Sequence, residues 1–270
     1  ADTRFEIEWA SVYTFQCRRM QKFRHGRLLF AGDAAHLVSP FGARGANSGI
    51  QDVDNLVWKL ALVMEGKADA ALLDTYDDER VAAADENLRN STRSTDFITP
   101  KSAVSRTFRD AVLALARRHP FARRLVNSGR LSVPAVLAHS ELNTPDRDTF
   151  AGAMVPGAPA ADAPVTGPHG NWLLDYLGGD FVLLVFGIAL PAVAPLGLPG
   201  IPCRIVQIGG TAASGQVVLG DAGQLAAARY DALPGTCYLL RPDQHVCARW
   251  RGFDAEAVRA SIARACGLTS

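Results

Sequence analysis

Hydrophobic and polar positions follow several patterns along the chain, and each pattern predicts a kind of element. Between residues 4 and 16, Phe5, Ile7 and Trp9 alternate with glutamates, which predicts a strand or hairpin. Residues 27–31 form a short apolar run, which predicts a buried strand. The first part of the chain is therefore expected to contribute strands.

Three helices are predicted in the middle of the chain. The first runs from Asn47 to Glu65 with Gly66 as its C-cap, and the second from Ala70 to Asn90. The third covers 105–127 and is interrupted near Pro120. The apolar positions that recur at helical spacing in the first helix are Ile50, Val53, Leu56, Val57, Leu60 and Met64.

Residues 131–169 are rich in proline and predict a long connection over a surface. After it, strand and helix patterns alternate. The expected strands are Phe181–Phe186, Arg204–Ile208, Val217–Leu219, Thr236–Leu240 and Val246–Trp250. The expected helices are Asp221–Tyr230 and Asp254–Cys266. These patterns predict an α/β chain with a first domain at 1–130 and a second α/β domain at 170–270.

One uncharged apolar stretch, residues 181–203, is long enough to suggest a membrane span. It contains Pro191, Pro195, Pro199 and Pro202, which would break a spanning helix repeatedly. A buried strand followed by an irregular apolar loop is the better interpretation, so no membrane partner is expected.

Composition and charge favour an ordinary globular protein of 270 residues. Lys and Arg number 28 against 27 Asp and Glu, which gives no electrostatic reason to expect nucleic acid as a partner. The five cysteines are an odd number without a CxxC, so neither a disulfide framework nor a metal site is predicted. With no signal peptide visible, a cytoplasmic location is expected.

The most informative segment is residues 32–55, GDAAHLVSPFGARGANSGIQDVDN. An apolar run stops at Gly32-Asp33, a loop with Pro40, Gly42 and Gly45 follows, and a helix begins. A carboxylate after a strand can accept hydrogen bonds from a hydroxyl chain. Glycines admit a flat ligand close to the backbone, and helix N-termini stabilise anionic groups. Together these features predict a site for a polar, partly anionic cofactor.

This segment resembles the second flavin-contacting motif of the FAD-dependent aromatic hydroxylases, the group-A flavoprotein monooxygenases. The resemblance implies that Asp33 contacts the ribityl chain of FAD and that the loop lies against the flavin ring. The residues expected to bind the cofactor are Asp33, Pro40, Gly42, Arg44, Gly45, Ala46 and Asn47. Arg44 either offsets flavin or substrate charge or is simply exposed.

The resemblance also implies a cavity for a small aromatic substrate. Trp9, Tyr13 and Phe41 are candidates to line it, and Phe15 shares their pattern, although a half-buried sheet face would show the same alternation. Asp52, Asn55 and Lys59 on the first helix, together with His36, are expected to be structural. No residue is assigned a catalytic role.

The order of elements after residue 170 resembles the thioredoxin-like C-terminal domain of the phenol hydroxylase and hydroxyphenylpropionate hydroxylase branch. The segment Arg241-Pro242-Asp243 between two strands carries this resemblance, with Gln244 where glycine is usual. In relatives this domain is structural and contributes to subunit contacts, so a homodimer is possible for this chain.

The resemblance implies hydroxylation of a phenol with FAD, NAD(P)H and dioxygen. No GxGxxG fingerprint for the ADP part of FAD occurs in the sequence. We therefore expect a C-terminal portion of a hydroxylase that lacks its N-terminal Rossmann portion, holds FAD weakly if at all, and is inactive by itself. The alternatives are a non-catalytic interaction or dimerisation module and a thiol-redox protein; the missing CxxC argues against the second.

Overall fold

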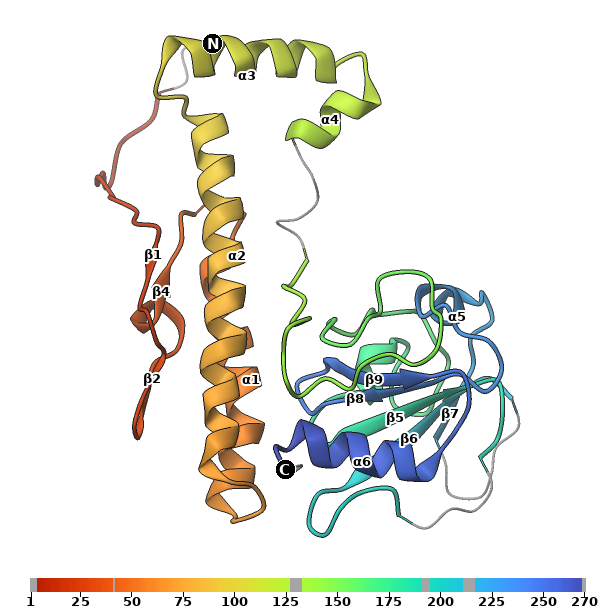
Figure 1. The fold of residues 1–270 in the computed structure, drawn as a ribbon. Helices are drawn as coiled ribbons and strands as arrows, with labels where there is room; N and C mark the ends of the chain where they lie inside the picture. The colour runs from red at the N-terminus through yellow and green to blue at the C-terminus, as the bar shows by residue number, and fades with distance from the viewer. Residues whose placement is uncertain (1–3, 41, 127–132, 191–194, 211–216, 269–270) are drawn as a thin grey trace.

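The computed structural model describes residues 4–40, 42–126, 133–190, 195–210 and 217–268. A helical half and a sheet-containing half lie side by side in Figure 1, with the long helix α2 between the small hairpins and the sheet. The predicted α/β class is confirmed. No helix in the described ranges combines the length and apolar character needed to cross a bilayer.

The N-terminal residues do not form the predicted strand. Residues 4–17 are exposed and have no regular secondary structure. An extended chain needs a neighbour to complete its backbone hydrogen bonds, and the described residues provide none here. The strands that do form are two residues long: β1 (Arg18–Arg19) pairs with β4 (His36–Leu37), and β2 (Arg24–His25) with β3 (Leu28–Leu29).

The three predicted helices are present with altered ends. The first, α1, covers Arg44–Met64 and starts three residues early, and Gly66 follows it with a φ of +67°. The second consists of a 3₁₀ turn (η2, Ala70–Leu73) and α2 (Asp74–Ile98), and it continues past Asn90. The third is divided at Pro120 into α3 (Ala103–Ala116) and α4 (Pro120–Val126); α3 crosses the end of α2 in Figure 1.

The C-terminal half is built on a five-stranded mixed sheet in the order β7-β6-β5-β8-β9. Strands β5, β6 and β7 are parallel, whereas β8 and β9 are antiparallel to their neighbours. This arrangement, followed by a helix, matches the expected thioredoxin-like class. The elements are η4 (Leu173–Tyr176), β5 (Phe181–Phe186), β6 (Cys203–Ile208), β7 (Val217–Leu219), α5 (Leu225–Arg229), β8 (Cys237–Leu240), β9 (Val246–Trp250) and α6 (Ala255–Ala265).

Both faces of this sheet are buried, which explains why β5 is apolar at every position. Val182, Leu184 and Phe186 pack with side chains from the connection and from α5. The alternate positions of β5 pack with α6 and with Trp58 of α1. The Trp58 ring meets Phe181 edge-on at 6.0 Å between centroids. The helical half is thus joined to the sheet through a shared apolar core.

Candidate flavin site

The turn at Gly32-Asp33 is a single turn of 3₁₀-helix, η1 (Gly32–Ala34), between β3 and β4. Asp33 is exposed, and no described residue donates a hydrogen bond to its carboxylate. It lines a cavity of about 230 Å³ together with Arg18, Arg19 and His36. An accessible carboxylate beside a hollow of this kind fits a ligand that presents hydroxyl groups.

Two glycines bring this turn against the following helix. Gly32 has a φ of +58°, in the left-handed region that favours glycine. A Cβ added to Gly49 of α1 would stand 3.2 Å from the Cα of Gly32. The close approach of η1 and α1 therefore depends on the absence of a side chain at position 49.

Asp52 on α1 holds the η1 turn in place through a hydrogen bond to its backbone. Its carboxylate accepts hydrogen bonds from the amide of Gly32 at 2.9 Å and from Arg80 Nε at 2.7 Å. His36 Nε2 lies 2.7 Å from the same carboxylate. Burial raises the pKa of Asp52, but the bond with His36 and the charge of Arg80 outweigh it, so the pKa lies below its usual value. Asp52 and His36 are structural in these contacts, as expected.

His36 is buried, and its second ring nitrogen, Nδ1, has no hydrogen-bond partner in the described chain. His36 also lines the cavity beside Asp33. The Nδ1 atom itself is shielded from solvent, so it is a buried polar atom without a partner in the described chain, which is uncommon in folded proteins.

The loop after β4 brings several predicted cofactor residues to the start of α1. Pro40, Gly42, Ala46 and Asn47 are exposed, and Gly45 is half-buried. Asn47 donates through its side chain to the carbonyl of Ala43, which lies just before the helix. The first turn of α1 is thus exposed at the expected place, although none of these residues lines the cavity at Asp33. Their role toward FAD stays a prediction.

The structure buries Arg44, so the expectation of a simply exposed side chain is wrong. Its side chain is buried and donates to the Asn87 side chain on α2 and to the carbonyl of Val133 at 3.0 Å. Those contacts direct the guanidinium to the interface of α1 with α2. The structure therefore gives Arg44 a packing role between helices.

The residues predicted to line a substrate cavity are not brought together. Trp9 and Tyr13 are 77% and 75% exposed, and neither lines the hollow at Asp33. Phe15 is 56% exposed and stacks on Tyr13. The remaining candidate, Phe41, lies outside the described residues.

Helix α1 buries its polar side and exposes much of its apolar side. The polar residues Ser48, Asp52, Asn55 and Lys59 are all at most 2% exposed. The apolar residues Ile50, Val53, Val57 and Met64 are between 49% and 78% exposed. These polar residues recur every three or four positions and so share one side of the helix, but their spacing does not indicate that this side is the buried one.

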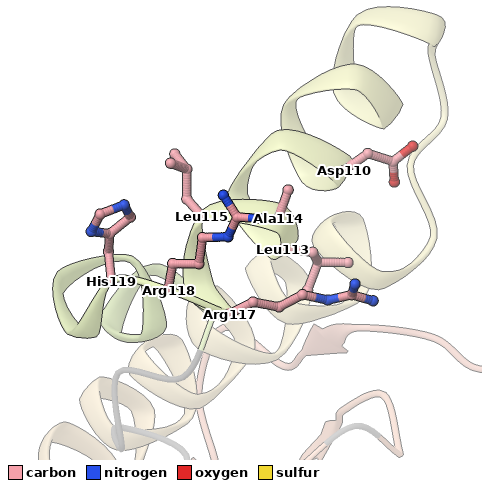
Figure 2. A pocket seen from close by; sticks show the side chains of 7 residues that line it. All are labelled: Asp110, Leu113, Ala114, Leu115, Arg117, Arg118 and His119. Carbon is pink, nitrogen blue, oxygen red and sulfur yellow. The ribbon is translucent and has the colours of Figure 1, made fainter.

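A second hollow, of about 590 Å³, lies where α3 meets α4. All of its lining residues are exposed, and none belongs to the flavin motif. Figure 2 shows that the side chains of Arg117, Arg118 and His119 point in different directions and do not converge on one position. This hollow therefore carries no arrangement suited to binding or catalysis.

The C-terminal domain offers no thiol-redox site. All five cysteines are free, and the sequence has no CxxC. Burial raises the pKa of Cys203 and of Cys237 to about 12, which opposes thiolate chemistry. In the turn that contains Arg241-Pro242-Asp243, Gln244 takes a φ of +60°, in the left-handed region that favours glycine. In the described ranges, no cluster of three or more acidic, His or Cys side chains could hold a metal.

Comparison with known families shows a similarity over the first part of the chain. The family described as FAD binding domain matches residues 1–91. The match includes the Gly32-Asp33 turn, the loop and both helices α1 and α2 up to residue 91. The prediction of FAD as the cofactor of this family is confirmed.

The curated relatives that match part of this chain are named as hydroxylases of aromatic acids. A 3-(3-hydroxy-phenyl)propionate/3-hydroxycinnamic acid hydroxylase of Mycolicibacterium vanbaalenii is 44% identical over 123 residues, which cover 46% of this chain and 22% of that protein. The hydroxylase of the same name from Escherichia coli is 43% identical over 113 residues, 42% of this chain and 20% of the relative. The matched part thus spans about a fifth of these curated relatives.

Solved structures match over nearly the whole chain. The rebeccamycin biosynthetic enzyme RebC with reduced flavin aligns with a TM-score of 0.70 and 25% identity, covering 99% of this chain and 50% of that one. The flavin-dependent monooxygenase PieE, in complex with FAD and substrate, has the same fold, with a TM-score of 0.70, 23% identity and 95% and 50% coverage. The predicted resemblance to FAD-dependent aromatic hydroxylases is confirmed.

Proposed function

We propose that this chain supplies the flavin-ring and ribityl side of a FAD-dependent monooxygenase that hydroxylates a phenolic compound with NAD(P)H and dioxygen. The carrying observation is the exposed, unpaired carboxylate of Asp33, placed in a hollow lined by residues of β1 and β4. When bound, FAD supplies the redox chemistry that activates dioxygen. The names of the relatives favour a hydroxyphenylpropionate-like phenol as substrate.

In this proposal each part of the site has its own task. Asp33 accepts hydrogen bonds from the ribityl hydroxyls, and the exposed turn at Ala46 and Asn47 stabilises negative charge on the pyrimidine edge of the ring, by about 0.3–2 kcal/mol. Asp52 keeps Gly32 in place, so that the Asp33 carboxylate stays directed at the ligand.

The exposed apolar side chains of α1 favour the proposal that another part of the enzyme packs on this helix. A contiguous apolar surface of that kind marks an interaction site. We propose that the dinucleotide-binding portion of the enzyme, with the GxGxxG that this sequence lacks, covers Ile50, Val53 and Val57. The isolated chain would then bind FAD weakly and be inactive. A GxGxxG encoded directly upstream of Ala1 would support this proposal.

A non-catalytic interaction module is the second candidate, because α3 and α4 expose apolar side chains at one end of the molecule. Val104, Phe108, Phe121 and Leu125 are each at least 60% exposed. Such a surface fits contact with another chain, including a second copy of this one. This candidate predicts a protein that takes up no flavin.

The visible spectrum of the purified chain, before and after addition of FAD, separates the two functions. We expect FAD to bind, and Asp33→Ala to weaken its binding without changing thermal stability, since the carboxylate makes no contact in the described chain. The matched control is Glu65→Ala, which removes an exposed carboxylate at the C-terminal end of α1, outside residues 32–55. Unchanged FAD affinity in Asp33→Ala would refute the assigned role, and a chain that takes up no flavin would favour the module.

A further inference from the structure

Four charged side chains meet in a fully buried cluster between the two halves of the molecule. Lys59 comes from α1, Glu79 from α2, and Arg241 and Asp243 from the turn between β8 and β9; each is at most 3% exposed. Two positive and two negative charges balance one another. Isolated charges are costly to bury, so the cluster is stable only while all four partners stay in place.

Glu79 is the centre of this charged cluster. Its carboxylate accepts from Arg241 Nη1 at 2.6 Å and from Lys59 Nζ at 2.7 Å. Arg241 also reaches Asp243, with 2.6 Å between Nη2 and Oδ2. Burial raises the pKa of Glu79, but the charges of Arg241 and Lys59 outweigh it, so Glu79 is held ionised. The C-terminal turn is therefore joined to α2 by a charge pair without access to water.

The same cluster reaches α1 directly. The amide of Asn55 donates to Glu79 at 2.7 Å and to Asp243 at 3.0 Å. Lys59 donates to Asn55 Oδ1 at 3.0 Å. Asp243 of the C-terminal domain thus accepts a hydrogen bond from α1, the helix that begins at the flavin loop.

From this cluster, polar contacts continue along α1 to its first residue. Asp52 bonds to Arg80 at 2.7 Å, and Asn87 donates to the hydroxyl of Ser48 at 2.9 Å. Arg44 then donates to Asn87. An apolar helix interface can slide with little loss, whereas a slip of one turn here, about 5.4 Å, would leave several buried polar groups unpaired.

We propose that the Arg241-Pro242-Asp243 turn is a remote positioning element of the flavin site. Through Glu79 and Asn55 it fixes α1 lengthwise against α2, and α1 carries the amides of its first turn and the carboxylate that holds Gly32. The inference rests on the proposed function, because the segment that is positioned is the flavin loop. Buried ionic groups are best attested in this role of setting the register between elements.

Backbone hydrogen exchange tests the positioning without any flavin. Arg241→Met removes the charge and keeps the length of the side chain. We expect amide exchange at residues 32–36 and 44–52 to accelerate about tenfold or more, while β5 and β6 stay protected. The matched control is Arg249→Met, a second buried arginine of the same domain, 6% exposed against 0% for Arg241; it pairs with Asp146 at 2.6 Å, and its hydrogen bonds go to Asp146 and to the Met154 carbonyl.

The proposal is overturned if exchange in Arg241→Met rises only beside the mutated cluster, or if Arg249→Met loosens residues 44–52 equally. Should Arg241→Met fail to fold, Asp243→Asn keeps an acceptor for Asn55 and removes one charge, and the same comparison applies. A chain that binds no FAD would defeat the proposed function, and the exchange experiment would still decide the positioning role.

Discussion

The carboxylate of Asp52 accepts the amide hydrogen of Gly32 at 2.9 Å, across twenty residues of chain. This bond joins the middle of α1 to the turn that presents Asp33. The same carboxylate neutralises Arg80, so one side chain fixes both the cofactor turn and the packing of α1 on α2. A buried ion with several donors cannot be replaced by a neutral group without leaving partners unsatisfied.

Asp52→Asn is therefore expected to lower the free energy of unfolding by about 3–5 kcal/mol, the usual cost of breaking a buried ion pair. An amide at this position must turn an NH₂ group toward Gly32 or toward Arg80, both of which are donors. Urea unfolding measures the loss. Asp96→Asn on α2, which removes only a surface partner of Lys101, is the control and should change stability little; equal effects of the two substitutions would contradict this account.

The buried carboxylate of Glu79 makes the free energy of unfolding depend on pH in the acidic range. Its folded pKa lies below the usual value of 4.5, so its contribution is complete above about pH 4.5 and is lost as the pH falls further. The stability difference between the wild type and Glu79→Gln should be largest near neutral pH and should shrink toward about pH 3. Urea midpoints measured across this range test it. Glu65→Gln removes a surface partner of Lys67 and should give a small difference at every pH; a parallel Glu79→Gln curve would count against the buried pairing.

Gly49→Ala should separate η1 from α1. The new Cβ would stand 3.2 Å from the Cα of Gly32, and backbone cannot move aside as a flexible side chain can. Overpacking of this kind costs about 1–3 kcal/mol, which exceeds the gain of about 1 kcal/mol in helix propensity. Gly45→Ala meets only Val38 Cγ2 at 3.8 Å and should keep that gain. Thermal unfolding that ranks Gly49→Ala as stable as Gly45→Ala would disprove the close packing.

The cysteines should differ sharply in reactivity. Cys17 is exposed, whereas Cys237, Cys247 and Cys266 are buried and burial raises the pKa of each. With Ellman's reagent near pH 8, we expect Cys17 to react fast and the partly buried Cys203 to react slowly, because burial raises the pKa of Cys203 to about 12. The three buried thiols should react only after unfolding. Cys17→Ser should abolish the fast phase, and a fast phase that persists when both Cys17 and Cys203 are replaced by serine would show that the C-terminal core opens readily.

The sequence predicted the C-terminal sheet closely, since Phe181–Phe186 is a continuous apolar run and Val246–Trp250 is an apolar run interrupted only by Arg249. It also located the Asp33 turn and the start of α1 within a few residues. Local patterns of this kind depend on near neighbours in the chain, which is why they can be recognised without a structure.

The buried side of α1 could not be predicted in the same way. Amphipathicity assigns Ile50 and Val53 to the core, yet the structure buries Asp52 and Asn55 instead. The reason lies far along the sequence, in Arg80, which pairs with Asp52, and in Glu79 and Asp243, which accept hydrogen bonds from Asn55. Similarly, nothing local indicates that residues 4–17 lack a neighbouring strand.

The exposed apolar side chains of α1 affect how the isolated chain behaves in solution. Kept alone at high concentration, the chain should bind environment-sensitive dyes such as anilinonaphthalene sulfonate and should tend to self-associate through Val53 and Val57. Val57→Lys should reduce this self-association. The same substitution should hinder the binding of any domain that covers these side chains.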